Sequence, residues 1–175
     1  MQPSREVLSE FIQDIKLIDT HEHIEREHEV NAQEKDIFGF FSHYAGSDLA
    51  SAGMPWSSWN VLFDENVEFS HKADIVLQYW PWIQHTGYGK AVSLILKDLF
   101  AVEELSQDTI KGASQKVAAS NHHGWYKNVL RTHAGIEIAM VDIGTTEVDR
   151  VLFQPVMRYD QFVLPYRSQD LIRLG

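Results

Sequence analysis

The chain has 175 residues, a formal net charge of −10 and no cysteine. This length is enough for one domain with a hydrophobic core, and 44% hydrophobic with 23% charged residues is ordinary for a globular protein. The acidity argues against a protein that binds the phosphate backbone of nucleic acids. The sequence also has no run of basic residues of the kind that binds a membrane surface. The lack of cysteine excludes disulfides, thiolate metal sites and cysteine nucleophiles.

The N-terminal segment "MQPSREVLSEF" lacks the apolar core of a signal peptide. No apolar stretch approaches the roughly 20 residues that a membrane-spanning helix needs. We therefore expect a cytoplasmic protein whose partner is a small-molecule substrate, with no nucleic-acid or membrane partner.

The first elements are a helix and a short strand. Ser4 is a suitable N-cap for a helix that follows it, because N-cap hydroxyls accept backbone N–H groups of the first turn. The apolar side chains of this helix fall on one face: Val7, Leu8, Phe11, Ile12 and Ile15. Residues 16–20 predict a strand that leads into the polar segment "HEHIEREHE".

A long, mainly helical region follows. Residues 31–66 show no sustained period and predict short helical turns. Residues 70–84 predict an aromatic helix that Pro81 should end or kink. Residues 91–105 form an amphipathic pattern, and Ser106 is expected to cap another helix that ends near residue 119.

Two apolar segments after Gly135 predict strands. "IEIAMVDIG" and "RVLFQPVMR" show little polar alternation, which is typical of strands buried in a parallel sheet. Residues 168–175 then predict the start of a helix. The fold class is therefore α/β, in a single incomplete domain of three segments: residues 1–30, the helical insertion 31–134, and residues 135–175. Three strands are too few for an eight-stranded barrel, which needs about 250 residues.

His21 and His23 are the candidate metal ligands. Residues i and i+2 of a strand point to the same side, so two imidazoles at a strand end can bind one divalent ion, and nitrogen ligands suit zinc. Asp19 would point to the same side of the strand as His21 and His23, and it is a candidate partner of these two ligands. The bare pattern is weak, since nine histidines in 175 residues give roughly 0.5 His-x-His pairs by chance. A polar exit from the strand remains the alternative.

The other polar clusters give weaker evidence for a functional site. His28, Glu25 and Glu29 are best explained as a solvated acidic turn, and His122-His123 as ordinary hydrogen-bonding residues. "GYGK" at residues 87–90 precedes a helix but lacks the glycine and the hydroxyl residue of a phosphate-binding loop, so a helix-start turn is preferred.

Four residues are candidates for substrate binding: His43, Tyr44, Asp142 and Arg158. The first two lie in an aromatic loop, where surface or core hydrogen-bonding roles are the default. Asp142 and Arg158 sit near the ends of the last two strands, and strand ends face the active site in α/β folds. A structural ion pair between such residues is the open alternative. No Gly-x-Ser-x-Gly motif supports serine chemistry.

Several stretches together resemble the amidohydrolase superfamily of metal-dependent barrel enzymes. "LIDTHEHI" resembles its first strand, with the His-x-His pair. "FFSHYAGSDLASAGMP" and "YWPWIQHTGYGKAVSLILKDLFAVEEL" resemble the helical insertion of the uronate isomerase branch and of related amidohydrolase-2 proteins. "VLFQPVMRYDQF" is similar to their third strand. The likeness extends over nearly the whole chain.

The resemblance implies a partial (β/α)8 barrel with a long helical insertion after its first strand. His21 and His23 match the first-strand ligands of a divalent metal, zinc foremost, and Arg158 matches a strand-end arginine. The family's remaining ligands and its aspartate base have no counterpart here, so no catalytic residue can be assigned.

We therefore expect the N-terminal portion of a metal-dependent hydrolase, inactive alone. The alternatives are a uronate isomerase-like enzyme, and a non-catalytic binding or self-associating remnant that forms homo-oligomers. A third is a plain α/β domain in which the two histidines are only polar loop residues.

Overall fold

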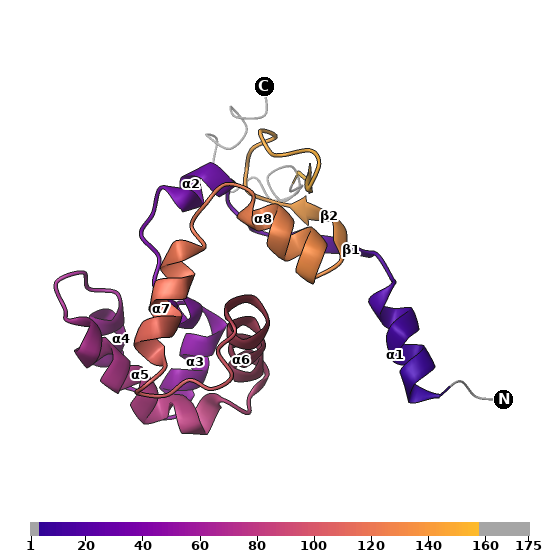
Figure 1. The fold of residues 1–175 in the computed structure, drawn as a ribbon. Helices are drawn as coiled ribbons and strands as arrows, with labels where there is room; N and C mark the ends of the chain where they lie inside the picture. Colours follow the sequence, from indigo (N-terminus) through magenta and orange to yellow (C-terminus); the bar gives the residue numbers. More distant parts are fainter. Residues whose placement is uncertain (1–3, 158–175) are drawn as a thin grey trace. The chain divides into compact units, whose positions relative to one another are not determined.

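The computed structural model describes residues 4–157, which form a mixed α/β structure with a three-stranded parallel sheet (Figure 1). The chain divides into two compact units. One contains the sheet and comprises the described residues up to Val30 together with those from His123 onward. The other is helical and comprises residues 31–122. Residues 123–134, assigned above to the insertion, thus cluster with the sheet.

The elements follow one another in chain order. Those of the sheet unit are α1 (Arg5–Gln13), β1 (Leu17–Glu22), α2 (Glu27–Asn31, which reaches the boundary), α8 (Trp125–Lys127), the π-helical segment η2 (Asn128–His133), β2 (Ile136–Val141) and β3 (Phe153–Pro155). Those of the helical unit are the 3-10 helix η1 (Ile37–Phe41), α3 (Tyr44–Ser51), α4 (Trp56–Leu62), α5 (Phe69–Ile83), α6 (Gly87–Phe100) and α7 (Ile110–Ala119).

The sheet has the order β1-β2-β3, and both pairings are parallel, which confirms the expectation from the apolar strands. Leu17 pairs with Ile136, and Glu22 pairs with Val141. The register of β1 shifts between Asp19 and Glu22, so its last residues depart from regular alternation. Because the strands are parallel, the carboxyl ends of β1 and β2 lie at the same edge of the sheet.

A small core holds the sheet unit together. It comprises Leu130 from η2, Ala139 and Val141 from β2, and Leu152 and Phe153 at the start of β3. Its aromatic edge is the Tyr126 ring of α8, which meets Phe153 edge to face at 6.0 Å between ring centroids. The helical segment before β2 therefore covers one side of the sheet at β2 and β3.

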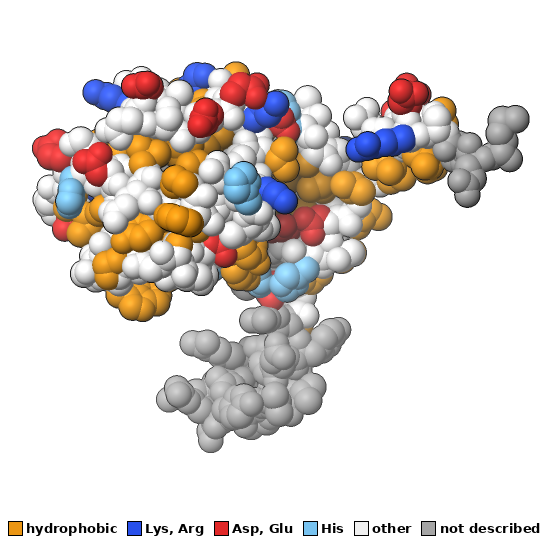
Figure 2. All heavy atoms as spheres, turned by 90° about the horizontal axis from the view of Figure 1, so that it is seen from below, with side chains coloured by type: hydrophobic (Ala, Val, Ile, Leu, Met, Phe, Trp, Pro, Cys, Tyr) orange, Lys and Arg blue, Asp and Glu red, His pale blue; other side chains and the backbone are white. Residues whose placement is uncertain are grey.

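Apolar side chains of α1 and β1 are left uncovered among the described residues. Ser4 caps α1 as expected, because its hydroxyl accepts the N–H of Val7 at 3.4 Å. The apolar face of α1 is nevertheless exposed, with Phe11 at 65%, and hydrophobic side chains are visible along this helix at the right of Figure 2. Ile18 of β1 is 59% exposed. None of the described helices has the length and apolarity needed to cross a membrane.

The helical unit has its own aromatic core. Phe38 and Phe41 of η1 are fully buried; Phe41 meets Trp80 edge to face at 6.0 Å, and Phe38 lies 5.2 Å from the Phe69 ring. The stretch without sustained period thus folds into η1, α3 and α4, which are short because no long apolar stripe runs through them.

Several helix boundaries differ from the sequence expectations. Helix α7 begins at Ile110 with Thr109 at its N-cap position, so Ser106 is not its cap. Helix α5 continues past Pro81 to Ile83, so the proline does not end it. Helix α6 starts at Gly87 because Thr86 Oγ1 accepts the N–H of Gly89 at 3.0 Å. It ends at Phe100 because Ala101 adopts a left-handed conformation, with φ 50°.

Gly89 marks a close approach between α5 and the first turn of α6. A Cβ atom at Gly89 would lie 1.9 Å from the carbonyl oxygen of Ile83, a backbone atom that cannot swing aside. Gly112, inside α7, has open space at the same position.

Gly89→Ala is expected to destabilise the protein by about 2 kcal/mol, because the methyl group forces α6 away from α5. Gly112→Ala should instead stabilise it by about 0.5–1 kcal/mol, because alanine loses less conformational entropy in a helix. Urea unfolding followed by circular dichroism measures both. Equal effects of the two substitutions would contradict the close packing at Gly89.

Candidate functional site

The predicted metal ligands come together at the carboxyl edge of the sheet. The Nε2 atoms of His21 and His23 lie 3.1 Å apart, and the two rings meet at 88° with centroids 4.7 Å apart. Both side chains are exposed. Two imidazole nitrogens therefore face one another at the position where β1 ends.

The carbonyl of Asp142, directly after β2, orients one of these rings. It lies 2.8 Å from Nδ1 of His23, while the Asp142 amide donates to the carbonyl of Glu22 at 2.9 Å. A carbonyl oxygen only accepts, so Nδ1 of His23 must carry the proton in the neutral ring. Nε2 is then left with a lone pair directed at His21, as in metal sites where the second ring nitrogen donates to a backbone carbonyl.

The acidic residues of β1 behave differently from the expectation. Asp19 does not contact a histidine ring in this structure; its carboxylate accepts the backbone N–H of His21 at 3.1 Å. The Glu22 carboxyl forms a side-chain hydrogen bond with Asp19. Burial, followed by the hydrogen bond and the charge of Asp19, raises the pKa of the Glu22 carboxyl.

The two histidines have the spacing of zinc ligands but supply only two of the four that a structural zinc site needs. Two nitrogens bound to one tetrahedral zinc at about 2.0–2.1 Å lie about 3.4 Å apart, close to the observed 3.1 Å. Within residues 4–157 no group of three or more His, Asp or Glu side chains is arranged to hold a metal ion. His21 and His23 thus supply two ligands, and structural zinc needs four.

The four candidate substrate-binding residues belong to different parts of the chain. Asp142 lies at the metal-ligand pair, through its backbone. His43 and Tyr44 belong to the helical unit, where the Tyr44 ring stacks on Tyr88 at 4.9 Å and 12°. Arg158 lies outside the described residues.

A cavity of about 510 Å³ in the sheet unit was not foreseen from the sequence. It is bordered by the segment after β1, the loop after β2 and α8, and we name it the acidic pocket. Its lining residues are Ile24, Glu25, Arg26, Glu27, His28, His123, Tyr126, Glu147, Val148, Asp149, Leu152 and Phe153. The segment interpreted above as a solvated acidic turn therefore forms one wall of a cavity.

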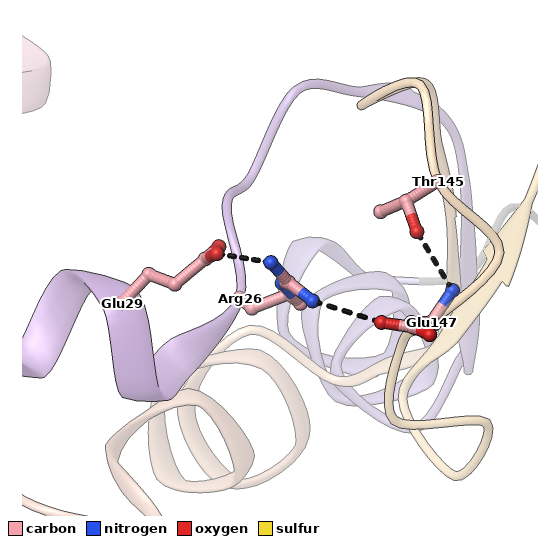
Figure 3. A network of polar contacts seen from close by, with 4 residues as sticks. All are labelled: Arg26, Glu29, Thr145 and Glu147. Carbon is pink, nitrogen blue, oxygen red and sulfur yellow. Dashed lines mark hydrogen bonds and ion pairs between the residues drawn. The ribbon is translucent and has the colours of Figure 1, made fainter.

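Arg26 joins two walls of the acidic pocket. Its guanidinium donates to Glu29 in α2 and, at 3.2 Å, to Glu147 in the loop after β2, as Figure 3 shows. The Glu147 amide in turn donates to the hydroxyl of Thr145 at 3.1 Å. The salt bridge to Glu147 holds the loop after β2 against the segment after β1.

Glu27 binds the part of the acidic pocket that contains α8. Its carboxylate accepts the backbone N–H groups of Gly124 at 3.0 Å and Tyr126 at 2.8 Å, and it pairs with the His123 ring at 3.1 Å. Burial opposes ionisation, but these hydrogen bonds and the His123 ring outweigh it, so the pKa of Glu27 is lowered. The Tyr126 hydroxyl responds oppositely: burial and the charges of Glu27 and Glu25 raise the pKa of Tyr126 to about 12.

Glu27→Gln is expected to cost about 2 kcal/mol of unfolding free energy at neutral pH, because the side chain is only 18% exposed and loses charge-assisted hydrogen bonds. Since folding lowers the pKa of Glu27 from 4.5, its contribution is complete above that value. The contribution is lost as pH falls through the lower folded pKa. Urea unfolding at neutral and acidic pH should show the difference between wild type and variant shrink on acidification.

Glu25→Gln is the matched control for this prediction, since Glu25 is exposed, and it should change stability by less than about 0.5 kcal/mol. A Glu27→Gln effect as small as that of the control would contradict a stabilising role of the Glu27 contacts with Gly124, Tyr126 and His123.

No protein-family model matches this chain, and no curated protein matches it.

Proposed function

We propose that this chain is the N-terminal portion of a metal-dependent hydrolase of the amidohydrolase type, built on part of a (β/α)8 barrel. The observation that carries the proposal is the convergence of His21 and His23, 3.1 Å apart at the carboxyl end of a parallel strand. In parallel α/β folds this edge is where ligands and active-site residues gather.

The order of elements supports the same proposal. A first strand, a long helical unit and a second strand that pairs parallel with the first are what the resemblance implies. The uncovered apolar side chains of α1 and β1 are those expected of a barrel wall whose neighbours lie elsewhere.

The chain's own residues would prepare the site for a divalent metal, zinc first. His23 keeps its Nδ1 proton on the Asp142 carbonyl and presents Nε2. In the metal-free chain this atom accepts a hydrogen bond from Nε2 of His21, which would release its proton to bind the metal. A bound metal supplies Lewis acidity and lowers the pKa of a bound water toward about 7. With two ligands and no base among the described residues, the chain alone should have little or no turnover.

Hydrolysis is preferred to uronate isomerisation as the reaction. The acidic pocket, next to the strand end in sequence, has four carboxylates against one guanidinium in its lining. Such a surplus of negative charge opposes the carboxylate of a uronate substrate. A uronate isomerase-like activity remains the alternative within the same superfamily.

Zinc titration of the purified chain tests the proposal. Isothermal calorimetry should give about one zinc per chain, and His21→Ala or His23→Ala should weaken binding at least about tenfold, because each removes a ligand. His85→Ala is the control, since His85 is an exposed histidine of the helical unit.

Zinc binding unchanged in both ligand variants would contradict the proposal. So would hydrolytic turnover by the chain alone near the typical enzyme value of about 10 s⁻¹, because that needs a complete site.

A second candidate is a non-catalytic, self-associating remnant of such a barrel, favoured by the exposed apolar face of α1. Uncovered apolar surfaces and open sheet edges promote association. Sedimentation at several concentrations separates the two: oligomers without zinc binding support the remnant, and a zinc-binding monomer supports the enzyme.

A further inference from the structure

We propose that the acidic pocket binds an organic cation, namely an ammonium group carried on an apolar body about the size of one aromatic ring. The pocket lies wholly within the sheet unit, and the inference does not depend on a metal at His21 and His23.

The size and the apolar lining of the pocket define the body of the ligand. Small-molecule sites are typically clefts of about 300–1,000 Å³ with apolar walls and a few convergent polar groups, and this cavity measures about 510 Å³. Its apolar lining is Ile24, Val148, Leu152 and Phe153, with Tyr126 beside Phe153. Two aromatic rings at right angles offer a face to an apolar group or to a cation.

The charges of the pocket define the head group. Four lining carboxylates face one lining guanidinium, so the net charge is −3 when His28 and His123 are neutral. Arg26 is already engaged by Glu29 and Glu147, and therefore adds little attraction for an anion. Burial is the main reason why the pKa of the Tyr126 hydroxyl is raised, and the negative charges of Glu27 and Glu25 raise it further.

Carboxylate oxygens remain available to a ligand. Glu147 is 82% exposed and pairs with Arg26 through Oε2. Asp149 accepts the Val151 amide through Oδ1 at 2.9 Å. Each of these side chains has a second oxygen that the same contact does not use, and Glu25 is exposed at the pocket wall. An ammonium group, with three donors, suits a pocket that is lined by several carboxylate acceptors.

The test uses three probes of similar size that share a phenyl ring and carry different head groups: 2-phenylethylamine, 2-phenylethanol and phenylacetate. Ligand-observed NMR and calorimetry on the whole chain should give the amine a Kd on the order of 1 mM or lower, as expected for so small a ligand. The alcohol should bind at least about tenfold more weakly, and phenylacetate more weakly still. In ¹H–¹⁵N spectra of labelled protein, the amine should shift the backbone amide signals of Tyr126 and Phe153.

A charge-removing pair of substitutions localises the effect. Glu147→Gln with Asp149→Asn keeps the acceptors for Arg26 and Val151 but removes two charges, and should weaken the amine about tenfold. Asp98→Asn with Glu103→Gln makes the same change in net charge in the helical unit and should leave binding unchanged.

His23→Ala should also leave amine binding unchanged, which separates failure of this inference from failure of the zinc site. Equal affinity for amine and phenylacetate would overturn the inference. The same holds for no amine binding up to about 20 mM, or for binding that survives the Glu147 and Asp149 pair of substitutions.

Discussion

The parallel pairing of β1 with β2 is the constraint on which the rest of the structure depends. It joins residues far apart in the sequence: the Asp142 amide donates to Glu22, and the Asp142 carbonyl accepts from His23. Because both strands end at the same edge, the segments that follow them become neighbours. The histidine pair lies at this edge, and the acidic pocket is lined by those two segments together with residues of α8 and β3.

Long-range polar contacts reinforce this pairing. Arg26 ties the segment after β1 to Glu147 in the loop after β2, and Glu27 binds the backbone where the chain returns from the helical unit. The helical unit has a similar tie of its own: the Asn121 amide donates to the carbonyls of Asn31 and Gln33, at 3.0 and 2.8 Å. Such ties offset the entropy of closing a long loop between two paired strands.

The sequence predicted those features that depend on local pattern. Two apolar runs indicated parallel strands, Ser4 indicated a cap, and His-x-His indicated convergence of two imidazoles. It could not predict the register shift in β1, nor that the Asp19 carboxylate accepts the backbone N–H of His21. Glu27 was also missed, because its partners lie 97 and 99 residues away and no local spacing signals them. The acidic pocket has the same origin in contacts between distant segments.

The candidate metal site therefore depends on how β1 and β2 place His23. Two-bond ¹H–¹⁵N correlation spectra of the metal-free chain, at a pH where the ring is neutral, report which nitrogen carries the proton. The account predicts that His23 is protonated on Nδ1, with the Asp142 carbonyl as acceptor, and that Nε2 is unprotonated. Protonation on Nε2 would contradict both the pairing of the strand ends and the availability of His23 as a ligand.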